Sequence, residues 1–515
     1  LGIVAPHDDT VVRIYPSVDT GTHPAGTVFN VTLDRGQTYQ LRNTDAGPAD
    51  LTGTIIQSNQ PVGVFGGHRC ARIEKPDTFY CDLVVEQILP LETWGTHYLA
   101  APLKTRRDYV LRILAQQDGI WRAGSVPPLA RERRVRTPRF FFPATSPVYP
   151  EPYGVALIFA PWNYPFQLSI GPLVSAIAAG NTAIIKPSEM TPAVSALVAR
   201  LVRETFPEEE VAVFEGGVET STQLLELPFD HIFFTGSPSV GQVVMAAAAH
   251  HLASVTLELG GKSPVVVDES ADIKAAARHI AWGKLTNSGQ TCIAPDHLYA
   301  HRSVAQALTE ELGKAIRHFY GKNSEAIRQS PDFCRIVNEH HFERVRGLFD
   351  DAVRKGARVA VGGEHDAAEN YFAPTVLTDV PEDAQVMEEE IFGPLLPVLP
   401  FDNLDEVIER INSMPKPLAL YVFGKNRDRI EKVVRQTSAG GMCINHNLLH
   451  YAHGNLPFGG VNHSGIGKAH GQFGFEAFSN QKSVLTQRFN AMHLLYPPYT
   501  RRVRRLVDWA VRRLG

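Results

Sequence analysis

The sequence has no uninterrupted apolar run of about 18 residues, which excludes a conventional membrane-spanning helix. Its N-terminus has no basic segment followed by an apolar one, so we expect no secretory signal peptide. One dominant sign of charge is also missing, because 50 basic and 54 acidic side chains leave a net charge of −4. This balance gives no reason to expect nucleic acid as a partner and favours a small ligand. The chain begins with Leu1 rather than Met, so we expect a fragment or a processed chain.

Cysteine is scarce, with five in the chain. Only Cys70 and Cys81 are near enough in sequence to suggest a pair, whereas Cys292, Cys334 and Cys443 are far apart. A Cys70–Cys81 disulfide requires an oxidising compartment, and a reactive thiol at Cys292 is best kept in a reducing one. We predict a cytoplasmic location, and the N-terminal segment suggests an extracellular one as the alternative.

The length of 515 residues exceeds the roughly 250 to 300 at which single cores stop growing, so the chain is expected to be modular. Residues 1–119 hold short β-type runs at 11–15, 28–33, 39–41 and 62–65, separated by turn residues. This pattern predicts an all-β segment. Since nothing in it looks catalytic, a structural module is the favoured interpretation and a binding module is the alternative.

Residues 120–150 are basic and interrupted by prolines, which is typical of a linker or an edge hairpin. A nucleic-acid patch is the alternative, but a solvated run of charge is more common. From residue 151 onward, apolar strand-like runs at 155–159, 182–185 and 231–234 alternate with helical patterns at 168–179 and 243–251. This alternation predicts an α/β fold, with a parallel sheet covered by helices on both faces.

Three small residues follow the strand at 231–234 and open the next helix: Gly236, Ser237 and Gly241. The two glycines would let the backbone turn tightly and approach a pyrophosphate, while the helix N-terminus supplies N–H donors. The spacing is not the usual GxGxxG, so the alternative is a glycine turn without a ligand. Lys186 and Glu189 follow another strand and offer a cation and a carboxylate three positions apart.

One thiol and one carboxylate stand in segments rich in small residues. Cys292 ends the run 287–292, where Gly289 and its neighbours predict an exposed loop, and Glu258 precedes two glycines. Such a pair is what thioester chemistry requires. A buried inert cysteine and an ion pair of Glu258 with Lys262 are the alternatives.

The aromatic, proline-rich run 161–165 contains Trp162 and Asn163. A rigidly held amide at Asn163 can stabilise the oxyanion of a tetrahedral adduct. The alternative for Asn163 is a local turn cap, the commoner role of an isolated asparagine.

Taken together, these motifs resemble the aldehyde dehydrogenases, in particular the class 3 branch with fatty-aldehyde and coniferyl-aldehyde dehydrogenases, over about residues 121–490. The resemblance implies the fold of that family, with a Rossmann-type cofactor domain and an α/β catalytic domain. It implies that Cys292 is the nucleophile, Glu258 the general base and Asn163 the oxyanion donor. The cofactor-binding residues that it implies are Trp162, Lys186, Glu189, Gly236, Ser237, Gly241, Glu390 and Phe392. The domain boundaries that we predict are 151–257 for NAD binding, 258–442 for catalysis and 443–490 for a returning cofactor and oligomerisation segment.

The resemblance further implies NAD-dependent oxidation of a hydrophobic aldehyde, aliphatic or aromatic, by a homodimer. Because Glu189 would repel a 2′-phosphate, we favour NAD and keep NADP as the alternative. Two features depart from the family pattern. The helices that usually precede the cofactor strands are replaced by the β segment, and Asn462 and Ala469 stand where the family commonly has Gly and Tyr. Despite these departures, the motifs together make class 3 aldehyde dehydrogenation our main hypothesis.

The N-terminal segment resembles the β domain named after the IgG Fc-binding protein, through the stretch 61–67 and residues 80–82. The second hypothesis is a surface or secreted binding protein with a truncated, inactive dehydrogenase part. A third is an artificial joining of two incomplete parts near Trp121.

The tail at 491–515 is basic and amphipathic, with Val503, Leu506, Val507, Ala510 and Leu514 on one helical stripe. We expect it to pack across a subunit interface, with an anionic membrane surface as the alternative partner. The positions of His446, His450 and His453 fit no known metal site, so we predict no metal.

Overall fold

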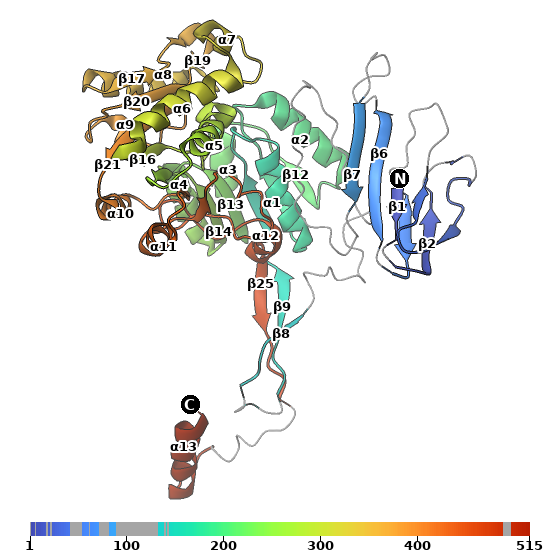
Figure 1. Cartoon of the computed structure of the whole chain (residues 1–515). Helices are drawn as coiled ribbons and strands as arrows, with labels where there is room; N and C mark the ends of the chain where they lie inside the picture. Colours follow the sequence, from blue (N-terminus) through green and yellow to red (C-terminus); the bar gives the residue numbers. More distant parts are fainter. Residues whose placement is uncertain are drawn as a thin grey trace. The chain divides into compact units, whose positions relative to one another are not determined.

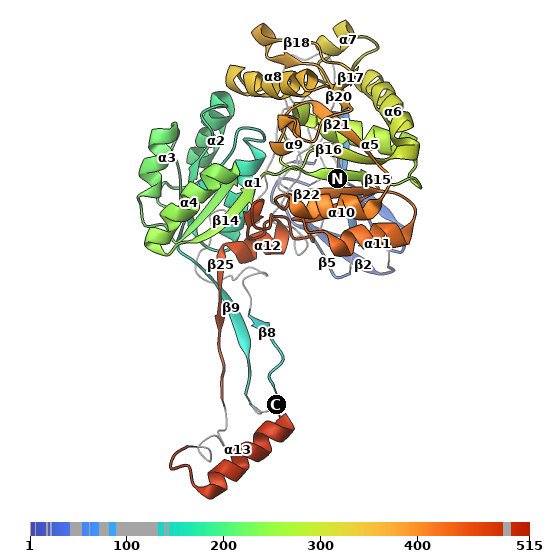
Figure 2. The same ribbon diagram turned by 90° about the vertical axis from the view of Figure 1, so that its left-hand side faces the viewer.

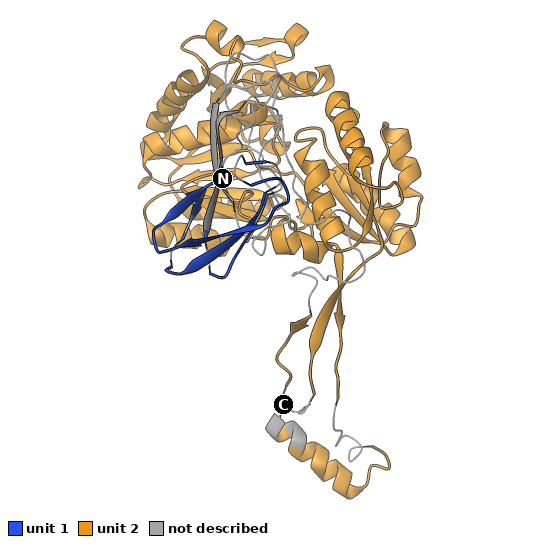
Figure 3. Cartoon of the chain, turned by 90° about the vertical axis from the view of Figure 1, so that its right-hand side faces the viewer, with its two compact units in different colours: residues 1–120 blue, residues 121–515 orange. Residues whose placement is uncertain are grey.

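The computed structural model describes residues 2–5, 7–16, 19–20, 23–41, 54–60, 62–71, 82–88, 132–138, 141, 144–487 and 496–514. The chain divides into two compact units, Leu1–Ile120 and Trp121–Gly515 (Figure 3). The predicted pair of Cys70 and Cys81 lies outside the residues whose side chains are described.

Unit 1 is built of antiparallel strands. A four-stranded sheet has the order β4-β1-β6-β7, with β1 at Gly2–Val4, β4 at Thr38–Gln40, β6 at Gly63–Ala71 and β7 at Asp82–Ile88. A three-stranded sheet has the order β3-β2-β5, with β2 at Thr10–Tyr15, β3 at Phe29–Leu33 and β5 at Ile55–Ser58. Val12 and Ile14 alternate with exposed residues along β2 and pack on Ile3 and Leu33. The described part of this unit holds strands and no helix, as predicted.

Unit 2 contains a six-stranded sheet of order β12-β11-β10-β13-β14-β24 (Figure 1). Its strands are β10 Val155–Phe159, β11 Thr182–Lys186, β12 Val211–Val213, β13 His231–Gly236, β14 Ser254–Leu259 and β24 Gly465–Ile466. Its helices are α1 Gln167–Ala178, α2 Pro192–Thr205, α3 Val218–Leu225, α4 Pro238–His251 and α12 Gly471–Ala477. All neighbouring strands are parallel except β24, which runs antiparallel to β14.

Successive residues of β10 face opposite sides of this sheet. Ala156 and Ile158 belong to a cluster with residues of α1, α2 and α12, whereas Leu157 and Phe159 pack with residues of α3 and α4. A strand that is buried on both faces needs apolar residues at every position, and this explains the continuous apolar run from Ala156 to Phe159. The predicted α/β sheet with helices on both faces is confirmed.

A seven-stranded sheet follows, with the order β17-β20-β21-β16-β15-β22-β23. Its strands are β15 Pro264–Val267, β16 His297–His301, β17 Arg358–Val361, β20 Thr375–Thr378, β21 Leu395–Phe401, β22 Ala419–Phe423 and β23 Gly441–Ile444. The remaining elements are α5 Ile273–Leu285, η4 Thr286–Gly289, α6 Arg302–Tyr320, α7 Ser324–Arg328, α8 Glu339–Arg354, β18 His365–Asp366, η5 Ala367–Glu369, β19 Tyr371–Phe372, α9 Gln385–Glu388, α10 Leu404–Ser413 and α11 Arg427–Gln436. Figure 2 shows β22 with α10 and α11, apart from β14 with α3 and α4.

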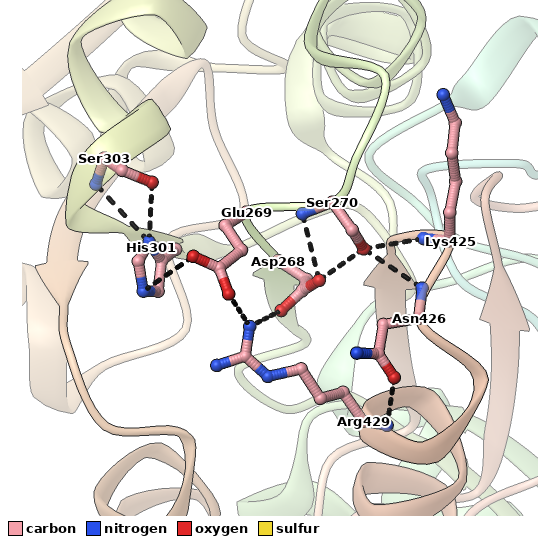
Figure 4. A network of polar contacts seen from close by, with 8 residues as sticks. All are labelled: Asp268, Glu269, Ser270, His301, Ser303, Lys425, Asn426 and Arg429. Atoms are coloured by element: carbon pink, nitrogen blue, oxygen red, sulfur yellow. Dashed lines mark hydrogen bonds and ion pairs between the residues drawn. The ribbon is translucent and has the colours of Figure 1, made fainter.

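A polar network joins the carboxyl ends of β15 and β22 in this sheet (Figure 4). Arg429 of α11 bonds both Asp268, at 2.7 Å, and Glu269, at 2.5 Å, just after β15. Ser270 receives the backbone N–H groups of Lys425 and Asn426 after β22. The opposite charges at the centre of this network are paired with one another, so we assign it a structural role.

Strands from the early and late parts of unit 2 form a separate antiparallel ribbon. Its order is β25-β9-β8, with β8 at Arg133–Arg134, β9 at Pro147–Pro152 and β25 at Ser479–Ser483. Helix α13 spans Arg501–Leu514. Across the described residues, no helix combines the length and the apolar character that crossing a membrane requires.

Candidate active site

The segment before Cys292 has an unusual backbone. Asn287, Ser288 and Gly289 lie in the left-handed region, with φ of 52°, 55° and 76°. A Cβ on Gly289 would stand 2.3 Å from the carbonyl oxygen of Gly393, so no other residue fits there without a shift of backbone. Strained backbone of this kind persists only where the surroundings fix it, and it places the thiol at the end of a rigid turn.

Hydrogen bonds of the buried Gln290 side chain hold this turn in place. Gln290 is 2% exposed, donates to the carbonyl oxygens of Asn287 (3.0 Å) and Arg335 (3.1 Å), and accepts from the N–H of Val337 (2.9 Å). The exposed loop predicted at 289–291 is therefore wrong. Gln290 is buried because backbone groups satisfy its amide, and the buried Thr291 hydroxyl has a side-chain partner in Tyr164. Cys292 itself is partly exposed.

Asn163 contacts the segment of Cys292 directly. Its Nδ2 donates to the carbonyl oxygen of Gln290 (3.1 Å), and its own carbonyl accepts from Nδ2 of Asn287 (2.9 Å). The neighbouring Tyr164 hydroxyl lies 2.8 Å from Oγ1 of Thr291. These bonds span more than 120 positions of sequence, so Asn163 is no local turn cap. Because an amide nitrogen has two N–H groups, Asn163 retains one for another acceptor.

Glu258 lies on β14 between Thr235 of β13 and Gly465 of β24. It is 5% exposed, and its Oε1 has no hydrogen-bond partner in the described part of the chain. Burial raises the pKa of Glu258 to about 8, against the opposing effects of the Thr235 hydroxyl and the Lys468 ammonium. Burial is also the main cause that raises the pKa of the Cys292 thiol, and the carboxyl groups of Glu258 and Glu390 raise it further. The site therefore holds a neutral thiol and a carboxyl that titrates near neutral pH.

Lys262 does not pair with Glu258, so that alternative is wrong. Its Nζ lies 2.5 Å from Oδ1 of Asp296 and donates to the carbonyl oxygens of Val386 and Glu389, both at 2.8 Å. The other oxygen of Asp296 accepts from the N–H of Ile391 (2.9 Å). Although burial opposes it, Lys262 holds the pKa of Asp296 well below its usual range. This buried ion pair connects the segment after Cys292 to the segment of Glu390.

Sequence reasoning missed Asp296 and Arg344, and it assigned Lys262 to the wrong carboxylate. Arg344 of α8 donates to the carbonyl oxygens of Glu390 (3.1 Å) and Ile391 (2.7 Å). None of these positions carries a motif of its own, because their partners lie 34 to 127 positions away.

In the acidic run 388–390, Glu388 and Glu389 are exposed, whereas Glu390 is partly buried. A Cβ on Gly260 would stand 2.1 Å from Oε2 of Glu390. Because glycine has no Cβ, the Glu390 carboxyl can approach the backbone after β14. Burial raises the pKa of Glu390 to about 8, and Asp296 adds to the effect. Phe392 has a φ of 43°, and its ring meets that of Trp162 edge-on at 5.4 Å between centroids. Trp162 and Phe392, predicted separately from sequence, therefore form one aromatic corner.

The remaining predicted residues follow β11 and β13. Nζ of Lys186 lies 2.6 Å from Oε2 of Glu189. Ser237 is the N-cap of α4 and accepts from the N–H of Val240 at 3.4 Å, so the helix begins where predicted. Gly236 ends β13.

Gly241 also has a structural reason in the packing of the sheet. A Cβ there would be 2.7 Å from Cδ2 of Leu259, so Gly241 permits close packing of α4 on β14. Helix and strand approach closely at this glycine, and a backbone approach to a pyrophosphate is not needed to explain it.

An aromatic group from the late part of the chain lies beside the thiol and the base. Both Glu258 and Cys292 affect the pKa of Tyr451, which burial raises well above its usual value. The Tyr451 hydroxyl accepts from Nε2 of Gln167 (2.9 Å), and its ring meets Phe458 and His470 edge-on at 4.9 and 4.5 Å. Tyr451 carries no motif of its own and was not predicted from the sequence. In the described residues no group of three or more His, Cys, Asp or Glu is arranged to hold a metal ion.

Comparisons with known proteins agree with this geometry. Residues 134–484 match the model of the aldehyde dehydrogenase family, and residues 1–120 match that of the IgGFc binding protein family. The chain is 48% identical over 372 residues to the 4,4'-diaponeurosporen-aldehyde dehydrogenase of Staphylococcus aureus, which covers 72% of this chain and 79% of that protein. It is 44% identical over 392 residues to aldehyde dehydrogenase family 3 member A2 of Mus musculus, covering 76% and 79% of the two chains.

A dimeric, NADP-preferring aldehyde dehydrogenase of Rattus norvegicus is 45% identical over 374 residues, covering 72% and 80% of the two chains. Among solved structures, the substrate-bound state of Staphylococcus aureus AldH has a TM-score of 0.70 and 46% identity, covering 74% of this chain and 82% of that one. From residue 134 to residue 484, this chain belongs to the aldehyde dehydrogenase family, in agreement with the class 3 resemblance of its motifs.

Proposed function

We propose that the protein oxidises a hydrophobic aldehyde, aliphatic or aromatic, to the carboxylic acid with NAD as the cofactor. The observation that carries the proposal is the convergence of a partly exposed thiol, Cys292, with a buried carboxyl, Glu258, and an amide, Asn163. No two of these side chains are close in sequence, and together they supply a nucleophile, a base and an oxyanion donor.

In the proposed reaction, the thiol of the partly exposed Cys292 gives its proton to solvent water and the sulfur bonds to the aldehyde carbon. The carbonyl oxygen becomes an oxyanion that accepts from the free N–H of Asn163 and from the backbone N–H of Cys292. When bound, the cofactor supplies the acceptor for the hydride that leaves the aldehyde carbon. Glu258 then takes a proton from water, whose oxygen bonds to the thioester carbon, and cleavage of the C–S bond releases the acid and restores the thiol.

Several residues are suited to hold the cofactor. Glu390 and the aromatic corner of Trp162 and Phe392 lie on the side of the thiol, whereas Lys186 and Glu189 follow β11. Glu189 favours NAD, because its carboxylate would repel a 2′-phosphate. We expect Glu189→Gln to improve the use of NADP relative to NAD, measured as the ratio of the two kcat/KM values.

The hydrophobic substrate is supported by the aromatic surroundings of the site. Tyr164 and Tyr451 lie near Cys292, and Phe458 and His470 pack against Tyr451. The name of the relative from Staphylococcus aureus gives a 4,4'-diaponeurosporen-aldehyde as its substrate. Aromatic surfaces of this kind favour apolar ligands with one polar end.

For the oligomeric state we propose a homodimer to which α13 contributes. Six of the 50 basic residues and one of the 54 acidic residues lie in α13, so the rest of the chain has a net negative charge that suits this helix in a second copy. Leu506 and Val507 of its apolar stripe are 44% and 38% exposed. A chain ending at residue 490 should shift toward monomer in analytical ultracentrifugation. If the shortened chain instead kept the mass of the full-length protein but lost binding to anionic vesicles, the result would support a membrane surface as the partner of α13.

The main test uses the full-length reduced protein with NAD or NADP and a panel of benzaldehyde-type and medium-chain aldehydes. We expect NADH formation that Cys292→Ala abolishes and that Cys334→Ala, at an exposed free thiol, leaves intact. Folded protein that forms no reduced cofactor would contradict the proposal. It would favour the second candidate, a binding protein, which rests on the family match of residues 1–120.

A further inference from the structure

We propose that Lys468 is a positioning residue for the general base: it fixes the loop that borders Glu258 and keeps a positive charge beside that carboxyl. The inference rests on the proposed role of Glu258 and adds a residue that the thiol, base and oxyanion donor do not include.

The loop in question, residues 458–469, is attached to the strand of the base. Gly465 pairs with Glu258 across β24 and β14, and the N–H of Leu259 donates to the carbonyl oxygen of Ser464 (3.0 Å). The two ends of the loop meet in a bridge between Phe458 and Ala469. A shift of this loop would therefore move the edge of the sheet at Glu258.

The Lys468 ammonium holds this loop from inside. Its Nζ donates to the carbonyl oxygens of Gly459 (2.5 Å), Gly460 (3.2 Å) and Gly440 (3.5 Å). The packing is tight, because a Cβ on Gly460 would stand 1.8 Å from the carbonyl oxygen of Ser464. An ammonium group with three donors matches three converging carbonyl oxygens, whereas an apolar side chain would leave them without a partner.

The same ammonium group is the cation that acts on the base. Lys468 favours the ionised form of Glu258, and Glu258 in return favours the charged form of Lys468 against the effect of burial. Among the described residues, Cys292 and Tyr451 also interact with Glu258, and their raised pKa values keep them neutral. Lys468 is thus the charge that offsets the burial of this carboxyl.

This arrangement predicts a selective effect on hydrolysis of the thioester. Removing the charge should raise the pKa of Glu258 further, and at neutral pH the ionised fraction of the base would fall. A rise of about half a unit to one unit corresponds to a loss of about three- to tenfold in the rate of hydrolysis at pH 7. Formation of the thioester, with its one equivalent of NADH, does not require this base to be ionised at that stage.

The test compares Lys468→Met, Lys468→Arg and a matched control, Lys416→Met. Lys416 is an exposed lysine that bonds Asn462 of the same loop at 2.9 Å. Steady-state turnover is measured from pH 6 to 10, and the burst of NADH per thiol counts the sites that form the thioester. We expect Lys468→Met to keep the burst, to lose about three- to tenfold in turnover at pH 7, and to approach the wild type at high pH. Lys468→Arg and Lys416→Met should keep the wild-type profile.

Two results would overturn the inference: a Lys468→Met profile that superimposes on the wild type, or one lowered equally at every pH with a smaller burst. The second result would mean a structural loop contact without an effect on the base. Wild-type protein that forms no Cys292-dependent NADH would contradict the proposed function first, and the role of Lys468 with it.

Discussion

The buried carboxyl of Glu258 should make the protein less stable at high pH. Its pKa of about 8 in the folded protein lies above its ordinary value of 4.5. The folded state therefore binds this proton more tightly than the unfolded state, and the stability that results is present below pH 4.5 and is lost as pH rises through 8. The full difference corresponds to about 5 kcal/mol, of which we expect about 2 to 4 kcal/mol to be measurable at pH 9.

The perturbation that isolates this effect is Glu258→Gln, which keeps the shape of the neutral carboxyl. Urea unfolding followed by fluorescence should give similar midpoints for variant and wild type at pH 5, and a higher midpoint for the variant at pH 9. Glu388→Gln, at an exposed carboxylate, is the control. In the same variant, turnover should fall by about 10² to 10⁴ while the burst of NADH remains. Equal midpoints at pH 9 would refute the reasoning from burial.

Two further substitutions test the packing of the site. Lys262→Met removes the partner of buried Asp296 and should cost about 3 to 5 kcal/mol of stability, seen as a lower Tm, and unchanged melting would contradict the assignment of this ion pair. Gly241→Ala should destabilise the protein by about 1 to 3 kcal/mol because its Cβ would stand 2.7 Å from Leu259. Gly171→Ala in α1, where a Cβ meets nothing within 4 Å, should instead be neutral or stabilise by up to about 1 kcal/mol. If both alanine substitutions changed the stability by the same amount, the close contact with Leu259 would not explain the effect at Gly241.

Local pattern predicted much of the fold. The apolar run 156–159 is a strand that is buried on both faces, and the helix after Gly236 has Ser237 as its N-cap. Both properties depend on neighbours in sequence, which a single chain reveals. The motifs around Cys292 and Glu258 likewise indicated the family before any comparison.

The sequence did not predict those parts of the site whose hydrogen-bond partners lie far apart along the chain. Small, polar residues at 289–291 suggested an exposed loop, but Gln290 is buried because Asn287, Arg335 and Val337 supply its hydrogen bonds. A sequence lists donors and acceptors without showing which of them meet, so the polarity of a segment alone does not decide its burial.

The sheet-forming runs, the family and the chemical types available at the site follow from local sequence pattern. How those groups pair with one another and how they titrate depends on the folded arrangement. Lys262 lies four positions from Glu258, yet it pairs with Asp296, while Lys468, 210 positions away, acts on Glu258. Coulomb energy depends on separation and on burial in space, and neither quantity follows from distance along the chain.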